Sequence, residues 1–460
     1  MLRSTRMLPA CMIPARMISV WAACVMAAAV ALSLPAAASG PAPRSEGWLV
    51  KSHTDIAIDP APQALQGEIE ALKAIVAKRT PNDVAQYRWW SVGGPVYRWN
   101  EIVVEEIQDG FVTMPLAARH LALFHAALDD ALAVSQRHRG TARMRAQSID
   151  TALARTGASA LAPSEHAAVA AAAADVLGYL FPARAAALAA RAEAAINARL
   201  VAGVDFPYEA AAGRAIGKQV AALAIARGKA DRTDAKWEGT IPDAAGLWKS
   251  ANPPIAPAAS SWQPWVMAHP SEFRPAAPPA VGSDRFKTDL NELKTFQRTP
   301  KSNHRATYWE VFGGARVHSL WNEIARTKTM EYGTPPAVTA RILAALNVAM
   351  TDAGIGCWDA KYVYWYPRPG MVDADLRTVV PAPNHPSFPS AHSCFSTAAA
   401  EVLAAAFPQD AERLRAIGRE ASEARVWAGI HYRFDLEAGQ EIGRKVAERT
   451  LGRAFAAPAK

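Results

Sequence analysis

The sequence predicts an all-α protein made of two tandem, duplicated helical bundles joined by a Pro/Trp-rich strap. Three observations lead to this prediction. Hydrophobic residues make up 51% of the 460 residues and charged residues 20%, a balance that excludes disorder and leaves room for two buried cores. Alanine dominates the apolar residues, and several long stretches have a helical period. Short motifs of the first half also recur in the second half.

The first 38 residues have the pattern of a signal peptide. Three arginines precede an apolar run at 18–34, and three alanines at 36–38 offer a cleavage site. An uncleaved anchor is the alternative, although the run of 17 residues is shorter than the usual span of about 20. Removal of this segment would lower the formal charge from +8 to +5. We expect a periplasmic or secreted protein without a nucleic-acid partner and, after cleavage, without integral membrane association; a homo-oligomer stays open.

The repeated motifs keep their order in the two halves. Trp-Asn-Glu-Ile occurs at 99–102 and again at 321–324. At a constant offset of 226, Pro-Ser-x-His at 163–166 matches 389–392, and Arg199 matches Arg425. An Ala-rich background explains chance similarity of helices, but it does not place Trp, His, Pro and Arg at fixed offsets. We therefore predict an ancient duplication.

Each half contains apolar stretches that predict long helices. They cover 115–133, 164–180 and 187–200 in the first half, and 336–353, 390–407 and 411–427 in the second. Between the halves, prolines from 253 to 279 prevent regular helix, and tryptophans lie among them. A flexible linker would be rich in Gly and Ser, so this segment is expected to pack across both bundles. The expected domains are a signal peptide over 1–38, an N-terminal bundle over 39–245, a strap over 246–282 and a C-terminal bundle over 283–460.

The second half gathers the side chains that can hold a tetrahedral oxyanion. Lys361 is followed after six residues by Arg368, and Arg425 lies further along the chain. Three cations close together would repel one another by several kcal/mol, about 4 each at 4 Å and an effective dielectric of 20, unless an anion neutralises them. Ser390 follows a proline and precedes a helical stretch, so backbone N–H groups at Ala391 should point at the anion.

Two histidines have separable roles in this arrangement. Asp435 follows His431 by four residues, so one helical turn lets its carboxylate hold one ring nitrogen and leaves the other as nucleophile or ligand. His392 follows Ser390 by two residues and is placed to act as a general acid or base. The spacing therefore predicts catalysis of proton transfer at a bound oxyanion.

Two cysteines remain after removal of the signal peptide. Cys357 and Cys394 form either a disulfide or two buried free thiols. The sequence leaves both alternatives open.

The second half contains three motifs: Lys361, six residues and Arg368-Pro369; Pro389-Ser390-Ala391-His392; and Arg425, five residues, His431, three residues and Asp435. Together they resemble the signature of the superfamily of type 2 phosphatidic acid phosphatases and vanadium-dependent haloperoxidases. The Trp-Asp-Ala-Lys-Tyr segment at 358–362, the His-Pro-Ser-Phe segment at 385–388, the strap and the two-bundle layout are similar to the haloperoxidase branch. The resemblance implies an oxyanion site formed by Lys361, Arg368, Ser390, the amide of Ala391 and Arg425. In a haloperoxidase, His431 would bind the vanadium of vanadate, Lys361 would polarise hydrogen peroxide, and a halide would be oxidised. In a phosphatase without cofactor, His431 would attack a small phosphomonoester.

Two positions qualify this resemblance. Family members usually have Gly where this chain has Ala391, and a methyl group narrows the allowed φ and crowds the cavity. His385 occupies a slot that is similar to the one in bromide-oxidising members, which implies a halide pocket for bromide or iodide with Trp358 as a second wall. A structural role for His385 and a core role for Trp358 are the alternatives.

The first half predicts no second active centre. At the offset of 226, Asp205 stands in the place of His431, Glu165 in that of Ala391 and Glu209 in that of Asp435. Carboxylates would repel an oxyanion, so the active centre is expected in the C-terminal bundle alone. The leading hypothesis is an exported vanadium-dependent haloperoxidase-like oxidoreductase. The second is a periplasmic acid phosphatase, and the third is a non-catalytic oxyanion-binding protein.

Overall fold

The computed structural model describes residues 46–139, 161–310 and 316–455. The predicted signal peptide at 1–38 lies outside these residues. The described parts consist of helices and irregular connections without a β-strand, which confirms the all-α prediction.

The helices of the first half come in a single run along the chain. They are α1 Gln66–Val76, α2 Pro81–Ser91, α3 Tyr97–Asp109, α4 Met114–Arg139, α5 Glu165–Leu180, α6 Ala185–Val201 and α7 Pro207–Ala230, with the short 3-10 helices η1 His53–Asp55 and η2 Pro182–Arg184. The predicted stretches at 115–133, 164–180 and 187–200 correspond to α4, α5 and α6. The sequence analysis had not predicted α1, α2, α3 or α7.

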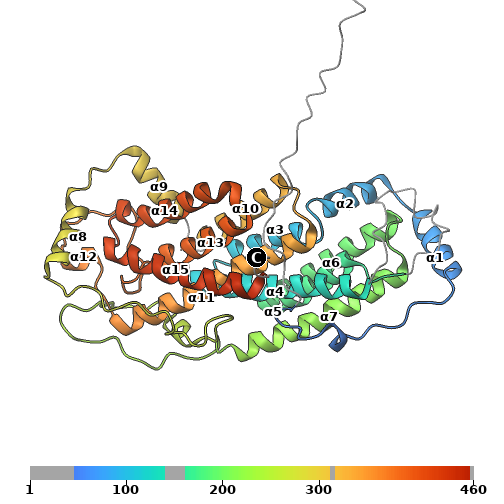
Figure 1. Cartoon of the computed structure of the whole chain (residues 1–460), viewed down its shortest axis with the longest axis horizontal. Helices are drawn as coiled ribbons and strands as arrows, with labels where there is room; N and C mark the ends of the chain where they lie inside the picture. Colours follow the sequence, from blue (N-terminus) through green and yellow to red (C-terminus); the bar gives the residue numbers. More distant parts are fainter. Residues whose placement is uncertain (1–45, 140–160, 311–315, 456–460) are drawn as a thin grey trace, which may run out of the picture.

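The helices of the second half follow the strap. They are α8 Asp284–Thr295, α9 Pro300–Glu310, α10 Arg316–Glu331, α11 Pro336–Tyr364, α12 Pro369–Val372, α13 Ala391–Ala406, α14 Ala411–Ala428 and α15 Arg433–Ala454, with the 3-10 helix η4 Pro408–Asp410. The molecule is elongated, with α8, α9 and α12 at one end and α1 and α2 at the other (Figure 1). Helices α4 and α11 pack together in the middle, and one hydrophobic core continues through both halves.

Helix α11 continues well beyond the predicted end at residue 353. Gly354 lies inside the helix, where a Cβ atom would come within 2.6 Å of the Phe395 ring. The glycine therefore serves close packing against α13 instead of ending the helix, because tertiary contacts outweigh its low helix propensity. This extension places Trp358 and Lys361 on the same buried helix.

Helix α11 is part of a stretch that is long and apolar enough, by length and hydropathy alone, to span a membrane. The qualifying stretch covers 336–372, and 94% of its most apolar window is buried inside the protein.

The strap contacts both halves of the chain. The carboxylate of Asp352 on α11 accepts hydrogen bonds from the amides of Trp265 (2.8 Å), Val266 (2.7 Å) and Met267 (3.1 Å). The guanidinium of Arg227 on α7 stacks over the Trp265 ring at 3.7 Å. Within 246–282 the helical structure consists of η3 Pro257–Ser261.

Helix α13 is packed between α14 and α15, and its first turn depends on glycines of α15. A Cβ atom at Gly439 would lie 2.6 Å from the carbonyl oxygen of Ser390. Gly213 on α7 lies in the same way against the carbonyl of Ser164. The corresponding helices of the two halves thus share this close contact, while the duplication itself stays a prediction.

We expect Gly439→Ala to lower the free energy of unfolding by about 1–3 kcal/mol, because the new methyl group would overlap a buried backbone oxygen. Gly452→Ala, on the same helix α15 and with no atom within 4 Å of its Cβ position, is the matched control. That control should leave stability unchanged or raise it by up to about 1 kcal/mol. Denaturant unfolding measures both; equal stabilities of the two variants would contradict this close packing.

Candidate functional site

Lys361, Arg368 and Asp435 contact the loop at 385–389 that leads into α13. Lys361 on α11 donates through Nζ to the carbonyl oxygens of Pro386 (2.8 Å), Ser387 (3.0 Å) and Pro389 (2.6 Å). These three bonds satisfy all three N–H donors of the ammonium. One buried lysine therefore gathers the carbonyl groups on the inside of the loop.

The structure differs from the sequence prediction at Lys361, whose ammonium faces the loop and does not line the pocket described below. A buried ammonium must be hydrogen-bonded, and the loop carbonyls supply acceptors within the protein. Burial lowers the pKa of Lys361 to about 8. Its contribution to a bound oxyanion is therefore its positive charge.

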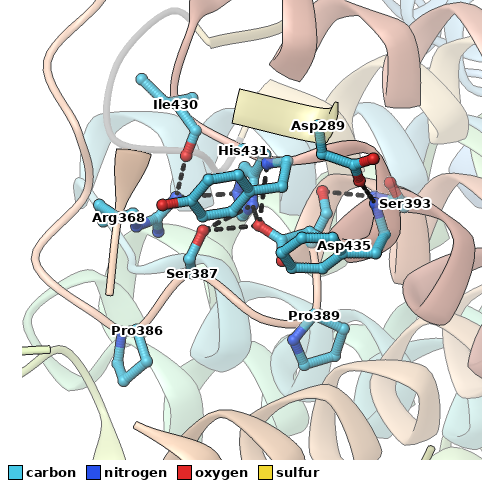
Figure 2. Close-up of polar contacts among 12 residues, drawn as sticks. Asp289, Arg368, Pro386, Ser387, Pro389, Ser393, Ile430, His431 and Asp435 are labelled. Carbon is cyan, nitrogen blue, oxygen red and sulfur yellow. Dashed lines mark hydrogen bonds and ion pairs between the residues drawn. The ribbon is translucent and has the colours of Figure 1, made fainter. Parts of the chain in front are cut away.

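Arg368, at the start of α12, links this loop to the segment before α15. Its guanidinium donates to the carbonyl oxygen and to Nδ1 of His385, both at 3.0 Å. It also donates to the carbonyl oxygen of Ile430 (3.0 Å) and to Nε2 of His431 (2.9 Å), as Figure 2 shows for the latter two residues. Burial lowers the pKa of Arg368 to about 10.

His431 is held in one tautomer by these neighbours. Its Nδ1 lies 2.8 Å from the Asp435 carboxylate, which also accepts from the Ser387 hydroxyl at 2.6 Å (Figure 2). Because an arginine can only donate, the bond from Arg368 requires a lone pair on Nε2 and leaves the proton on Nδ1. Burial and the nearby positive charges of Arg368 and Lys361 keep the pKa of His431 well below its usual value. The imidazole is therefore neutral, as a ligand or nucleophile requires.

Asp435 lies in the first turn of α15, one turn after His431 as the spacing predicted. Its carboxylate accepts a hydrogen bond from the amide of Tyr432 (3.2 Å) and so caps the N-terminus of α15. Its backbone carbonyl accepts a hydrogen bond from the amide of Ser390 (2.9 Å). Burial raises the pKa of Asp435 to about 7, against the opposing effect of the Ser387 hydroxyl. The Ser390 hydroxyl caps α13 by accepting the amide of Ser393. Residue 435 thus joins the starts of α13 and α15.

A pocket of about 390 Å³ lies at the N-terminus of α13. Six of the predicted site residues line it: Trp358, His385, Ala391, His392, Arg425 and His431. Four others lie outside its lining: Lys361, Arg368, Ser390 and Asp435. The sequence analysis missed the other lining residues, because they carry no catalytic motif. They come from the start of α4 and the residue before it, the strap, α9, the segment before residue 385 and the turn between α14 and α15: Thr113, Met114, Pro115, Ile255, Thr307, Glu310, Val380, Pro381, Ala382, Pro383 and Ile430.

Arg425 on α14 is paired with an acidic residue that sequence reasoning did not find. Its guanidinium forms an ion pair with Glu310 at the end of α9 and donates to the carbonyl of Ala306 (3.0 Å). Its Nε is buried and has no hydrogen-bond partner among the described residues. Burial lowers the pKa of Arg425, and the Glu310 carboxylate opposes this change. A carboxylate of the protein therefore neutralises part of the predicted anion site.

His392 occupies the second position of α13 and lines the pocket. Its Nε2 lies 2.9 Å from the carbonyl oxygen of Trp309 and 3.8 Å from the Glu310 carboxylate. A carbonyl only accepts, so Nε2 carries the proton and Nδ1 is free to accept one. Burial and the charge of Arg425 keep the pKa of His392 well below its usual value. Ala391, the first helical residue, has a conformation that alanine adopts readily.

The two residues of the predicted halide pocket lie in contact. The rings of Trp358 and His385 are 5.3 Å apart at an angle of 48°, and both line the pocket. Behind them, Cys357 and Cys394 are buried free thiols, and Cys357 donates to the carbonyl of Pro389 (3.7 Å). The disulfide alternative is therefore absent from the structure, because the Cys357 thiol instead serves as a donor to the loop.

The corresponding place in the first half is filled by a carboxylate of the protein. Asp205 accepts two hydrogen bonds from Arg199 (2.7 and 2.9 Å) and one from the Ser164 hydroxyl. These donors correspond to Arg425 and Ser390 at the offset of 226. An internal anion thus satisfies the groups that would otherwise attract an external one.

The residues around the pocket fit vanadate or phosphate. Arg425 Nε is an unpaired donor, and the first-turn amides of α13 have no partner within their own helix. His431 Nε2 carries a lone pair, which accepts a hydrogen bond from Arg368 in this structure. The described residues contain no group of three His, Cys, Asp or Glu suited to a metal cation. A single imidazole with surrounding donors matches a tetrahedral oxyanion better than a bare cation.

Comparison with known proteins places this site in a family. Residues 342–448 match the model of the PAP2 superfamily, which confirms the superfamily that the motifs predicted. Non-specific acid phosphatases of Salmonella typhi and Salmonella typhimurium (strain LT2) are 40% and 39% identical to this chain over 57 residues, 12% of its length. The chain spans 23% of the length of these relatives.

The fold of about three quarters of the chain is similar to solved haloperoxidases. A structure described as the first bacterial vanadium-dependent iodoperoxidase superposes with a TM-score of 0.63 at 21% identity, covering 79% of this chain and 97% of that one. A holo-type bacterial vanadium-dependent chloroperoxidase gives a TM-score of 0.53 at 14% identity, covering 74% and 90%. At these identities the likeness establishes the fold.

We expect Glu310→Gln to bind inorganic phosphate about tenfold more tightly than the unchanged protein, because it removes a negative charge that competes for Arg425. Isothermal titration calorimetry of the full chain measures this change. Glu420→Gln is the matched control, since Glu420 pairs with Arg305 and Trp309 and does not line the pocket. Weaker phosphate binding in Glu310→Gln would mean that Glu310 positions Arg425 more than it competes with an anion.

Proposed function

We propose that the chain is an exported vanadate-dependent haloperoxidase-like enzyme that oxidises bromide or iodide with hydrogen peroxide. One observation carries this proposal: His431, whose Nδ1 is held by Asp435, lines the same pocket as Arg425 and the start of α13. The fold shared with the iodoperoxidase and the chloroperoxidase supports it. Export to the periplasm or the medium rests on the first 38 residues.

In this proposal one residue is the ligand of vanadium, others donate hydrogen bonds to the oxygens of vanadate, and Lys361 contributes positive charge without contacting it. His431 Nε2 would hold vanadium, and Arg425 with the amides at the start of α13 would hold the oxygens. When bound, vanadate would supply the transfer of oxygen from hydrogen peroxide to the halide. Arg368 donates to both Nε2 of His431 and the Ile430 carbonyl, so it would have to give up the bond to Nε2 while the Ile430 carbonyl could still accept from it. Lys361 adds positive charge from behind the loop.

His392 handles the proton in this proposal. Its Nδ1 takes a proton that hydrogen peroxide loses, while Nε2 stays on the carbonyl of Trp309. The low pKa of His392, caused by burial and Arg425, favours return of that proton to the leaving water. Trp358 and His385 form the wall on which the halide is proposed to bind.

A second candidate function is phosphomonoester hydrolysis, favoured by the 40% identity with a non-specific acid phosphatase over 57 residues. The same residues would act without a cofactor. His431 Nε2 would attack phosphorus, and His392 would protonate the leaving alcohol and then take a proton from water.

We expect His431→Ala to reduce halide oxidation to below about 1% of the unchanged enzyme, because the ligand atom is lost. Asp435→Asn should reduce it about 10–100-fold by disturbing the His431 tautomer. Triiodide formation at saturating vanadate and peroxide measures both. Asp289→Asn is the control, since Asp289 binds the amide of Phe434 at the start of α15 and has no contact with His431.

Three results separate the candidate functions. Halide oxidation retained in His431→Ala would overturn the role of this residue. Hydrolysis of p-nitrophenyl phosphate that vanadate inhibits, without halide oxidation in the unchanged chain, would establish the phosphatase. Vanadate binding with neither activity would leave a non-catalytic oxyanion-binding protein.

A further inference from the structure

A second cavity lies between the strap and the last turns of α15. Its volume is about 700 Å³, and it shares no lining residue with the pocket at the start of α13. One wall comes from the strap at 265–273 and the other from 445–453 of α15, which runs toward the middle of the elongated molecule (Figure 1). Clefts of about 300–1,000 Å³ are typical of sites for small molecules. This cavity is therefore large enough for a small organic ligand.

The wall formed by α15 carries positive charge. Lys445, Arg449 and Arg453 follow one another at intervals of four residues, so they lie along one face of the helix. Glu448 is the one acidic residue of the lining, which leaves the cavity with a formal charge of +2. A concave surface with this charge attracts an anion.

Each of these cations also has a carboxylate partner outside the lining. The pairs are Lys445–Glu441 (2.6 Å), Arg449–Glu272 (2.7 Å) and Arg453–Glu46 (3.1 Å). The three cationic side chains are 35–50% exposed, and exposed pairs contribute at most about 1 kcal/mol. The bond from Arg449 to Glu272 uses one of its N–H groups and leaves others available. The partners thus orient the cations and still allow them to bind an incoming anion.

The wall formed by the strap supplies aromatic surface. Trp265 and Phe273 both line the cavity. The Trp265 ring is fixed by Arg227 of α7, which stacks over it at 3.7 Å, and by the edge-to-face contact with Trp48 at 6.4 Å. Arg449 lies over the Phe273 ring at 5.7 Å, so a cation and an aromatic ring are neighbours in the cavity. A preformed wall loses little conformational entropy when a ligand binds.

We infer that this cavity binds a small organic anion that carries an apolar ring, such as an aromatic carboxylate or sulfonate. The ring lies against Trp265 and Phe273, where it leaves water. The anionic group accepts charge-assisted hydrogen bonds from Lys445 and Arg449. We assign binding and no chemical step to this cavity, and the assignment is independent of the reaction proposed at His431.

Calorimetry of the full chain with naphthalene-2-sulfonate tests the ligand class. We expect this probe to bind at least about tenfold more tightly than methanesulfonate, which lacks the ring, because the ring buries apolar surface. It should exceed 2-naphthylmethylamine, which has the ring and the opposite charge, by a similar factor of about ten. Failure of the probe to bind, or an equal affinity for either of the other two compounds, would overturn the inference.

A glycine on the α15 wall allows the bound probe to be located. Gly452 is exposed, lines the cavity and has no atom within 4 Å of its Cβ position. Gly452→Trp should fill the cavity and weaken binding of the probe at least about tenfold. Gly67→Trp, at an equally open position on α1 at the far end of the molecule, is the matched control and should keep the affinity. An unchanged affinity in Gly452→Trp would place the probe elsewhere and overturn the assignment.

Charge variants on α15 identify the groups that hold the anion. Lys445→Gln and Arg449→Gln should each weaken binding of the probe about fivefold, because each removes one ion pair with the ligand. Arg444→Gln is the matched control, since Arg444 adjoins Lys445 on α15 and does not line the cavity. An equal loss of affinity in all three variants would mean that the overall charge of the helix attracts the probe, and would overturn the site.

Discussion

The structure depends on the burial of three cations in one region of the C-terminal half. Lys361, Arg368 and Arg425 are each 2% exposed or less. A charge removed from water must find hydrogen-bond partners within the protein, and like charges close together must be neutralised. The carbonyl groups of the loop at 385–389 satisfy the first requirement for Lys361, and Glu310 satisfies the second for Arg425.

This requirement explains why the site has a defined shape in the ligand-free chain. The loop is folded around donors from α11 and from the start of α12, and it carries the His385 ring into the pocket. Its Ser387 hydroxyl shares the Asp435 carboxylate with His431, so the loop and the His431 imidazole are oriented by the same oxygen. Groups that act on a substrate and groups that hold them in position are therefore parts of one hydrogen-bond network.

Each half of the chain buries an arginine at this position, and different groups neutralise its charge in the two halves. In the first half, Asp205 neutralises Arg199 permanently, which makes that site a structural unit. In the second half, a neutral imidazole takes that position, and Glu310 from another helix neutralises Arg425. The first half still contributes to the active pocket, because the start of α4 forms part of its uncharged wall.

The sequence by itself determined the helical class and the pairing of His431 with Asp435. These features are local, since helical periodicity and a four-residue spacing at a helix start translate directly into geometry. Only the tertiary structure decided that Lys361 faces carbonyl groups, that α11 runs past Gly354, and that Glu310 pairs with Arg425 across 115 positions of sequence. Contacts between distant segments are set by how whole helices pack, and no short motif records that packing.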